Sequence, residues 1–201
     1  MPHTVKITAA LVAFALAGGA GPALAAADVS GKPAAQPADG AVMQKLTRAE
    51  MRSLAQKYPA QTKRMREVTG RADAVAYRIY NWHSDKCLAI GSSSTANGAN
   101  AIQWDCIDSN AQFWYADDDL HILNFNSGKY LAIGSSSTAN GAKAIQWDYT
   151  GSDGQRWYGD NDHHIINLHS GKYLAIGSSS TDNGAKAIQW DYTGSDGQRW
   201  Y

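Results

Sequence analysis

A 43-residue repeat constrains the fold of this chain more than any other feature of its sequence. Three Gln-x-Trp triplets end in Trp114, Trp157 and Trp200, at intervals of 43 residues. Over 39 aligned positions the second and third units differ at only five, whereas the first and second differ at 14. A unit this short cannot bury its apolar face alone, so we expect the three units to pack around one core.

Each unit carries four short runs with the composition of β-strands. In the second unit they are residues 121–125, 130–133, 144–148 and 155–158. The pairs Ser127-Gly128, Asn140-Gly141 and Asp153-Gly154 separate these runs and supply the positive φ that tight turns require. Four strands per unit predict an all-β protein with twelve short strands around a pseudo-threefold axis.

The two cysteines occupy repeat positions that hold tyrosines in the other units. Cys87 and Cys106 align with Tyr130 and Tyr149 in the second unit and with Tyr173 and Tyr192 in the third. Because both members of the pair change together, we expect the two side chains to touch in every unit. A disulfide suits an exported chain, and closing a loop of about 20 residues contributes about 3 kcal/mol. The alternative is a pair of free, buried thiols.

Residues 1–27 have the features of a secretory signal peptide. Lys6 precedes an apolar run over residues 7–17, and small residues follow in Ala23-Leu24-Ala25 and Ala25-Ala26-Ala27. The apolar run is shorter than the ~20 residues that span a bilayer, which disfavours the alternative of an uncleaved membrane anchor. We therefore expect a secreted, extracellular protein that has no membrane span after signal removal.

Two segments separate the signal peptide from the repeats. Residues 28–44 are rich in Ala, Pro, Gly and Asp, and they predict a flexible linker. Residues 45–76 predict a basic helical segment, because Thr47 and Glu50 have the spacing of a capping box. Apolar side chains then recur on one helical face, at Met51, Leu54, Ala55 and Tyr58. Pro59 ends or kinks this helix.

The charges of the chain are segregated although its formal net charge is zero. Residues 77–201 hold eight Lys and Arg against thirteen Asp, and this acidic balance argues against a nucleic-acid partner. Residues 45–71 hold eight Lys and Arg against two Glu. We favour a solvated spacer helix for this segment. The alternative is an electrostatic anchor on an anionic cell envelope, formed by Lys45, Arg48, Arg52, Lys57, Lys63, Arg64 and Arg66.

The chain shows no pattern typical of a catalytic, metal-binding or cofactor-binding site. None of the six His has metal-ligand spacing with Cys or lies in a nucleophile motif. The acidic turns at residues 117–119 and 160–162 lack the spaced Gly and terminal Glu of a calcium loop. No pair of carboxylates stands out for glycoside hydrolysis. We therefore expect a protein that is not an enzyme and that needs no metal or cofactor.

Trp-Asp pairs raise one alternative fold. They begin at Trp104, Trp147 and Trp190, with a period inside the range of WD-repeat propellers. A propeller typically needs 4–8 blades, whereas only three units exist, and the Gly-His half of the signature is missing. These differences disfavour the propeller.

The motifs of residues 77–201 resemble those of the ricin-B-type (R-type) lectins. Three Gln-x-Trp units, Lys86-Cys87-Leu88 and Gln103-Trp104-Asp105-Cys106 carry this resemblance. It implies a β-trefoil, in which three hairpins cap a six-stranded barrel, with units at residues 77–119, 120–162 and 163–201. Similar modules are attached to many bacterial enzymes that degrade polysaccharides.

The resemblance also implies which residues bind sugar. The Trp of each Gln-x-Trp triplet is a core residue, whereas the aromatic residue before the second Cys position is a sugar platform, here Trp104, Trp147 and Trp190. An indole stacks on the apolar face of a pyranose, and polar side chains must hold the hydroxyls. The candidates for that role are Gln103, Gln146 and Gln189 beside each platform, and Asn110, Asp153 and Asp196 before each triplet.

The chain departs from the family at two polar positions. The family's Asp after the first Cys is replaced by Ala89, Ala132 and Ala175. The family's Asn before the triplet is replaced by Ala111, Gly154 and Gly197. We therefore consider two functions. The first is non-catalytic binding of a glycan or polysaccharide, including one on a cell surface. The second is a protein-interaction or inhibitor module on a trefoil scaffold with degenerate sugar sites.

Overall fold

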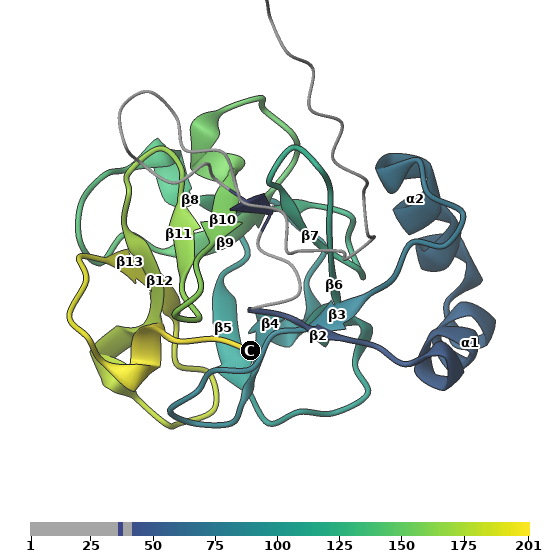
Figure 1. The fold of residues 1–201 in the computed structure, drawn as a ribbon, viewed down its shortest axis with the longest axis horizontal. Helices are drawn as coiled ribbons and strands as arrows, with labels where there is room; N and C mark the ends of the chain where they lie inside the picture. The colour runs from purple at the N-terminus through teal and green to yellow at the C-terminus, as the bar shows by residue number, and fades with distance from the viewer. Residues whose placement is uncertain (1–35, 38–41) are drawn as a thin grey trace, which may run out of the picture. The chain divides into compact units, whose positions relative to one another are not determined.

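Three repeats of one strand pattern build the protein (Figure 1). The computed structural model describes residues 36–37 and 42–201, so the expected signal peptide and most of the expected linker lie outside the described residues. The first unit contains β3 (Tyr77–Arg78), β4 (Cys87–Ile90), β5 (Ala101–Trp104) and β6 (Trp114–Ala116). The second contains β7 (Ile122–Asn124), β8 (Tyr130–Ile133), β9 (Ala144–Trp147) and β10 (Trp157–Gly159). The third contains β11 (Ile165–Asn167), β12 (Tyr173–Ile176) and β13 (Ala187–Trp190), and its fourth strand is a bridge from Trp200 to Asn81.

The same antiparallel hairpin register recurs in each unit. In the second unit, β8 and β9 pair Tyr130 with Trp147 and Leu131 with Gln146. The hairpins β4–β5 and β12–β13 pair at the equivalent positions. Bridges between Asn100 and Ile145, Ile102 and Lys186, and Lys143 and Ile188 then join the three hairpins. The expected all-β trefoil of twelve short strands is confirmed.

The Trp residues of the three triplets form the centre of the core. Trp114, Trp157 and Trp200 are fully buried, together with Leu and Ile side chains from every unit. Each indole nitrogen donates to a main-chain carbonyl of its own unit, such as that of Leu131 for Trp157 at 2.9 Å. A buried indole needs such an acceptor, since an unpaired N–H group inside a core is costly.

Part of the expected linker is structured rather than flexible. The strand β1 (Gln36–Pro37) pairs with β10, and β2 (Gln44–Lys45) pairs with β3. Val42 and Met43 lie in the barrel core with exposures of 0% and 2%. Burying these two apolar side chains compensates for the entropy of ordering the segment, which composition alone does not reveal.

Two helices precede the repeats, as the sequence predicts. The helices α1 (Arg48–Lys57) and α2 (Pro59–Thr69) meet at Pro59, and Thr47 and Glu50 form the expected capping box. The second helix contains 11 residues. Pro59 occupies its first turn, where the missing N–H group of proline costs nothing.

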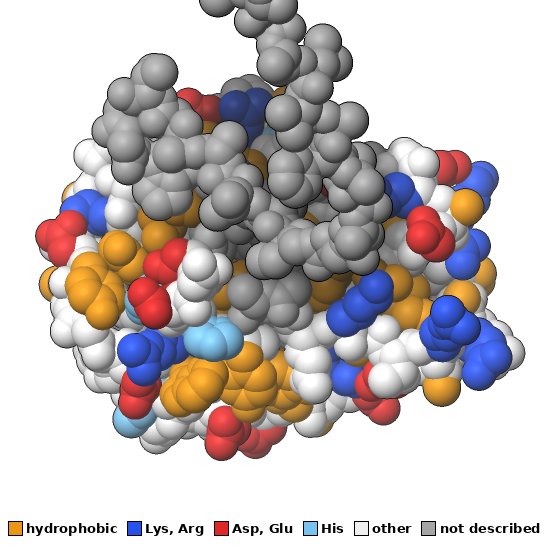
Figure 2. All heavy atoms as spheres, viewed as in Figure 1, with side chains coloured by type: hydrophobic (Ala, Val, Ile, Leu, Met, Phe, Trp, Pro, Cys, Tyr) orange, Lys and Arg blue, Asp and Glu red, His pale blue; other side chains and the backbone are white. Residues whose placement is uncertain are grey.

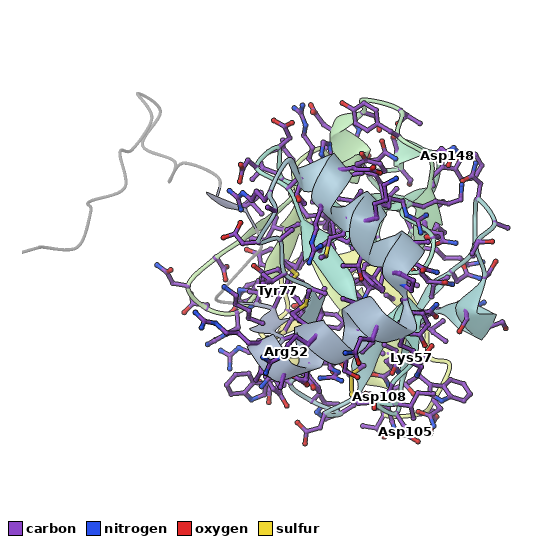
Figure 3. All side chains as sticks on the ribbon, turned by 90° about the vertical axis from the view of Figure 1, so that its right-hand side faces the viewer. Arg52, Lys57, Tyr77, Asp105, Asp108 and Asp148 are labelled. Atoms are coloured by element: carbon purple, nitrogen blue, oxygen red, sulfur yellow. A yellow bond between two sulfur atoms is a disulfide. The ribbon has the colours of Figure 1, made fainter. Side chains whose placement is uncertain are left out.

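The helices are docked on the trefoil and do not form the solvated spacer that we favoured. Leu46, Leu54 and Met65 are buried in a second apolar cluster. The trefoil contributes Phe113, Tyr115, Leu123 and Phe125 to that cluster. Polar contacts reinforce it, since Arg78 pairs with Glu50 at 2.7 Å and Lys57 donates to the main-chain carbonyl of Asp108 at 3.3 Å. Figure 3 shows Lys57 and Asp108 next to one another.

Cys87 and Cys106 form a disulfide, which confirms the prediction from the repeat. At the same position of the other units, Tyr130 packs on Tyr149 and Tyr173 packs on Tyr192, with ring centroids 5.1 Å apart in both pairs. The hairpin end of each unit is therefore closed by a covalent bond in one case and by two aromatic rings in the others. No helix within the described residues is long and apolar enough to cross a membrane.

Candidate functional site

Three equivalent indoles stand on the surface of the trefoil. Trp104, Trp147 and Trp190 end β5, β9 and β13, and their exposures are 42%, 41% and 41%. The alternation of a β-strand explains this position, because the preceding Gln points inward and the Trp outward. The edge of each ring approaches a glycine of another unit, so that a Cβ on Gly98 would lie 3.4 Å from the Trp147 ring.

The Asp that follows each of these Trp residues fixes the end of the strand. The carboxylate of Asp148 accepts from the side chain of Asn97 in the first unit at 2.7 Å and pairs with Lys129 in its own unit. Asn97 also accepts the main-chain N–H of Asp148 at 3.0 Å. The hydrogen bonds from Lys129 and Asn97 lower the pKa of the Asp148 carboxyl, which therefore stays ionised.

The same Asn–Asp contact recurs between the other units, so that the three contacts form a closed ring. Asn140 in the second unit holds Asp191 in the third, and Asn183 in the third unit holds Asp105 in the first, each at 2.7 Å. Each of these three Trp residues is thus positioned by its own unit and by a neighbouring unit. This arrangement orients the three indoles before any ligand arrives.

A shallow cavity lies beside each of two exposed Trp residues. The cavity at Trp147 measures about 280 Å³ and the one at Trp104 about 300 Å³. The Trp147 cavity is lined by Ala132, Ile133, Gly134, Ser135, Ser136, Ile145, Thr150, Ser152 and Gln155. Cavities of this size accept a single sugar ring, and they combine an aromatic wall with hydroxyl groups.

A Gly-Ser-Ser turn that the sequence interpretation missed forms one side of the cavity. Ser135 and Ser136 both adopt the left-handed conformation, with φ of 54° and 48°, and the first and third units repeat this geometry. Such angles are unfavourable for residues other than glycine and persist only where the surrounding structure holds them. The signal was available in the sequence, because Gly-Ser-Ser recurs unchanged at residues 91–93, 134–136 and 177–179.

The geometry accounts for the missing family Asn. A Cβ built on Gly154 would lie 2.9 Å from the Ser136 hydroxyl oxygen, and one on Gly197 would lie equally close to Ser179. In the second and third units the turn before the triplet therefore presses against the Gly-Ser-Ser turn and leaves no room for a longer side chain, and the first unit has Ala111 at this position. Ala132 lies among the residues that line the cavity, where the family carries a carboxylate. No charged side chain of the described residues lines the Trp147 cavity.

The structure places Gln103, Gln146 and Gln189 between units, not in the cavities. All three are fully buried. The amide nitrogen of Gln146 donates to the carbonyls of Ser94 and Ala96 in the first unit, and its oxygen accepts from Ser127 at 2.7 Å. With every polar atom satisfied by protein, these glutamines are not available to a ligand, which corrects the sequence interpretation.

The other expected polar partners also face away from the cavities. Asp153 pairs with Arg156 at 3.2 Å and Asp196 pairs with Arg199 at 3.3 Å. The amide nitrogen of Asn110 donates to the side chain of Asn126 at 2.8 Å. None of these residues lines the two cavities described above. Gln155 of the triplet does line one, and its amide donates to the main-chain carbonyl of Asp148 in its own unit.

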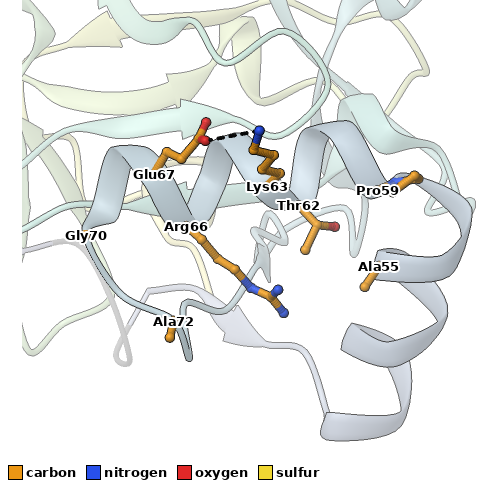
Figure 4. A pocket seen from close by; sticks show the side chains of 8 residues that line it. All are labelled: Ala55, Pro59, Thr62, Lys63, Arg66, Glu67, Gly70 and Ala72. Atoms are coloured by element: carbon orange, nitrogen blue, oxygen red, sulfur yellow. Dashed lines mark ion pairs between the residues drawn. The ribbon is translucent and has the colours of Figure 1, made fainter.

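An open groove of about 530 Å³ lies on the helical segment and not at the exposed Trp residues (Figure 4). It runs between α1 and α2 past Ala55, Pro59 and Thr62, and the Lys63–Glu67 ion pair spans 3.6 Å at its rim. An open groove with one solvent-exposed ion pair offers little to fix the orientation of a small ligand. We therefore place the functional site at the Trp cavities.

Two buried His side chains each pair with an Asp, away from the Trp cavities described above. Nδ1 of His121 lies 2.8 Å from Asp117, and Nδ1 of His164 lies 2.7 Å from Asp160. Both imidazoles pack edge-on against the paired tyrosines of their hairpins. Within residues 36–37 and 42–201, no three His, Cys, Asp or Glu side chains group closely enough to hold a metal ion.

The trefoil fold and the repeated surface indoles define a lectin-type module. The model of the ricin-type β-trefoil lectin domain matches residues 75–200, which is more than half of the chain. The chain therefore belongs to the ricin-type β-trefoil lectin family, whose domain is a carbohydrate-binding module. None of the curated proteins matches the chain.

Solved structures resemble the same part of the chain. ThreeFoil, a designed threefold-symmetric protein, is 37% identical, with a TM-score of 0.60 over 62% of this chain and 95% of that one. An exo-β-1,3-galactanase from Clostridium thermocellum is 28% identical, with a TM-score of 0.58 over 64% of this chain and only 30% of the enzyme. The C-half of an earthworm R-type lectin in complex with GalNAc is 21% identical, with a TM-score of 0.54 over 63% and 95%, and shows the fold alone.

Proposed function

We propose that this chain is a secreted, non-catalytic protein that binds glycans through the exposed indoles of Trp104, Trp147 and Trp190. The observation that carries the proposal is the exposed indole, repeated three times in one geometry. A ring of this size that serves only to fill the core is normally buried, as Trp114, Trp157 and Trp200 are. Family membership supports the carbohydrate class of the ligand.

The lining of the cavities favours an uncharged sugar. The Trp147 cavity offers the hydroxyl groups of Ser135, Ser136, Ser152 and Thr150 and the apolar surface of Ala132 and Ile145. It holds no cation that would pair with a sialic or uronic acid carboxylate. A neutral pyranose with one apolar face matches this surface, because its C–H groups meet the indole while hydroxyls meet serines.

The same proposal includes secretion and the absence of catalytic activity. The disulfide between Cys87 and Cys106 suits a chain that folds outside the cytoplasm. Export is tested by comparing the N-terminal residue of the protein in the culture medium with the expected start near Ala26 or Asp28. A full-length chain that stays in the cytoplasm contradicts export.

A glycan array tests the binding proposal. The exported chain is compared with the variant Trp104→Ala, Trp147→Ala, Trp190→Ala on neutral and acidic glycans. We expect binding to neutral glycans that falls at least tenfold in the variant, and unchanged melting as the control for folding. Equal binding by both proteins, or binding to acidic glycans alone, contradicts the proposal.

The second function, a protein-interaction or inhibitor module, has one specific observation in its favour. Both family positions that would supply a carboxylate and an amide are occupied by Ala or Gly, at Ala132 and Gly154 in the second unit and at equivalent residues in the others. If the folded chain binds no glycan on the array, the protein-interaction or inhibitor function is favoured over glycan binding.

A further inference from the structure

A cluster of aromatic side chains lies where the third unit meets the first. Tyr80 stacks on Tyr201 with centroids 5.1 Å apart, and Trp82 meets Tyr201 at 81° with centroids 5.6 Å apart. The ring of His163 lies 5.2 Å from that of Trp82. We call these four residues the aromatic corner. Figure 2 shows hydrophobic side chains gathered near the place where Figure 1 marks the C-terminus.

The pseudo-threefold symmetry gives this corner two counterparts, and the first is covered by the helices. In the second unit the positions of Tyr80 and Trp82 are Leu123 and Phe125, which are buried under Leu54 and Met65. Arg64 of α2 also donates to the carbonyls of Ser127 and Asn126, and this contact covers the adjacent turn.

The second counterpart lies where β1 joins the trefoil. Its positions are Ile166, Leu168 and Tyr158, and β1 pairs with β10 through Tyr158. Ile166 is 5% exposed. In contrast, Trp82 is 46% exposed, the most exposed of the seven Trp residues of the chain. Leu168, the counterpart of Trp82, is half-buried. Within the described residues, the first counterpart is therefore buried and the second partly so, whereas the aromatic corner is the most exposed of the three.

The turn beside the aromatic corner carries a carboxylate where the other units carry glycine. Asp85 adopts φ of 54°, and the equivalent positions are Gly128 and Gly171, with φ of 72° and 67°. A non-glycine residue in the left-handed region costs free energy that only a local benefit offsets. The benefit here is a fixed acceptor, since the Tyr201 hydroxyl donates to Asp85 at 3.0 Å.

We propose that the aromatic corner is a fourth carbohydrate contact, in which Trp82 stacks on one pyranose ring of a glycan chain while Asp85 accepts from its hydroxyls. The corner offers the two components that recognise a pyranose, an exposed aromatic ring and a polar acceptor held beside it. It lies outside the proposed sites at Trp104, Trp147 and Trp190.

The size of the exposed surface favours a sugar over a protein partner. Protein interfaces usually bury about 800 Å² on each side. Of the four residues of the aromatic corner, only Trp82 is a large apolar residue that is exposed. Its neighbours His83 and Asp85 are polar. One exposed indole matches one pyranose ring.

Indole N–H resonances test this contact directly, because the chain has seven Trp residues and each gives one signal. The folded chain is titrated with the β-1,4-linked hexasaccharides of glucose and of N-acetylglucosamine and with a β-linked galactose hexasaccharide. We expect the Trp82 signal to move with at least one of them, while the signal of buried Trp114 stays fixed. Trp82→Ala should then lower the affinity for that probe roughly three- to tenfold.

The variant Trp104→Ala, Trp147→Ala, Trp190→Ala separates this contact from the proposed cavities. A Trp82 shift that persists in this variant supports a fourth contact. Shifts of Trp104, Trp147 and Trp190 in the parent chain, with Trp82 unmoved by all three probes, overturn the fourth contact and leave the proposed function standing. Val68→Ala, at an exposed apolar residue of α2, is the matched control and should bind every probe as the parent does.

Discussion

The side-chain amide of Gln146 donates a 2.8 Å hydrogen bond to the main-chain carbonyl of Ser94, which belongs to the preceding unit. The same contact joins Gln189 to Ser137 and Gln103 to Ser180, each at 2.7 Å, so it links all three units in a closed ring. These glutamines are therefore determinants of how the repeats assemble.

Gln146→Leu tests this assembly. The substitution removes the amide that bonds the partly buried carbonyls of Ser94 and Ala96 and the oxygen that accepts from Ser127, so we expect the free energy of unfolding to fall by about 1–3 kcal/mol. Denaturant unfolding measures the change. Gln56→Leu, on the exposed side of α1, should stay within about 0.5 kcal/mol of the parent chain. Equal midpoints for the two variants would show that the junction does not depend on this amide.

The 43-residue period and the turn pairs predicted twelve short β-strands around a pseudo-threefold axis, and the resemblance to the R-type lectins then implied the trefoil. The site was harder to predict. Gln146 stands next to Trp147 in the sequence, but successive side chains of β9 point to opposite faces, so only the Trp reaches the surface. Proximity to Trp147 in the sequence therefore does not place Gln146 in the site.

Long-range packing explains why the segment before the repeats differs from its expected form. The composition of residues 28–44 is that of a linker, yet Val42 and Met43 fill space in the barrel. The basic character of α1 and α2 indicated a solvated helix, whereas Leu54 and Met65 form a narrow apolar stripe that packs on Phe125. A few apolar residues determine docking, and average composition conceals them.

Loss of the disulfide should destabilise the trefoil without dismantling it. Replacing Cys87 and Cys106 by Ser frees a loop of 19 residues and should cost about 3 kcal/mol, because the unfolded chain gains freedom. Chemical unfolding with and without reductant measures this. Reductant should lower the midpoint of the parent chain and leave that of the variant unchanged. A reductant effect on the variant would point to a cause other than this bond.

Trp157→Ala should affect folding strongly. The residue is fully buried, and its removal leaves a large cavity and an unpaired carbonyl at Leu131, so we expect a loss of about 3–5 kcal/mol. Trp147→Ala, ten residues earlier and largely exposed, is the matched control and should cost less than about 1 kcal/mol. Similar melting temperatures for the two variants would contradict the assignment of one Trp to the core and the other to the surface.

The docking of α1 should weaken in acid. Hydrogen bonds from Arg78, and then from Thr47, lower the pKa of Glu50 from 4.5 to about 2. Because the folded-state pKa is depressed, this stabilisation is complete above about pH 4.5 and is lost as the pH falls toward 2. The Glu50 side chain is 41% exposed, so solvent screening reduces its contribution to roughly 1–2 kcal/mol.

Unfolding at pH 6 and pH 3 isolates this contribution. Other carboxyl groups also titrate in this range, so the quantity of interest is the difference between the parent chain and Glu50→Gln. The variant should be less stable at pH 6, and the gap should narrow at pH 3. Glu67→Gln, at an exposed pair with Lys63, should show no such gap. A gap for Glu50→Gln that is constant with pH would show that its charge does not contribute.

Removing two of the three platforms should abolish attachment to a polysaccharide surface. Trp147 and Trp190 lie in nearly identical units, with the same exposure of 41% and the same neighbouring turns, so both are expected to bind the same ligand. Each indole offers a surface for one sugar ring, which makes a single site weak. Sites held on one rigid body gain affinity from simultaneous binding, and that gain is lost when only one remains.

Trp147→Ala should therefore reduce binding of a free sugar modestly but reduce retention on an insoluble polysaccharide much more. The double variant with Trp190→Ala should lose most retention while its melting temperature stays close to that of the parent, since a surface indole contributes little to the core. Pull-down on insoluble polysaccharide, with calorimetry of each variant, measures both quantities. If the folded double variant is retained as strongly as the parent, these indoles are not sugar platforms. The absence of a carboxylate at Ala132 and Ala175 would then favour a protein partner, because those cavities would have neither the stacking nor the polar contacts that hold a sugar.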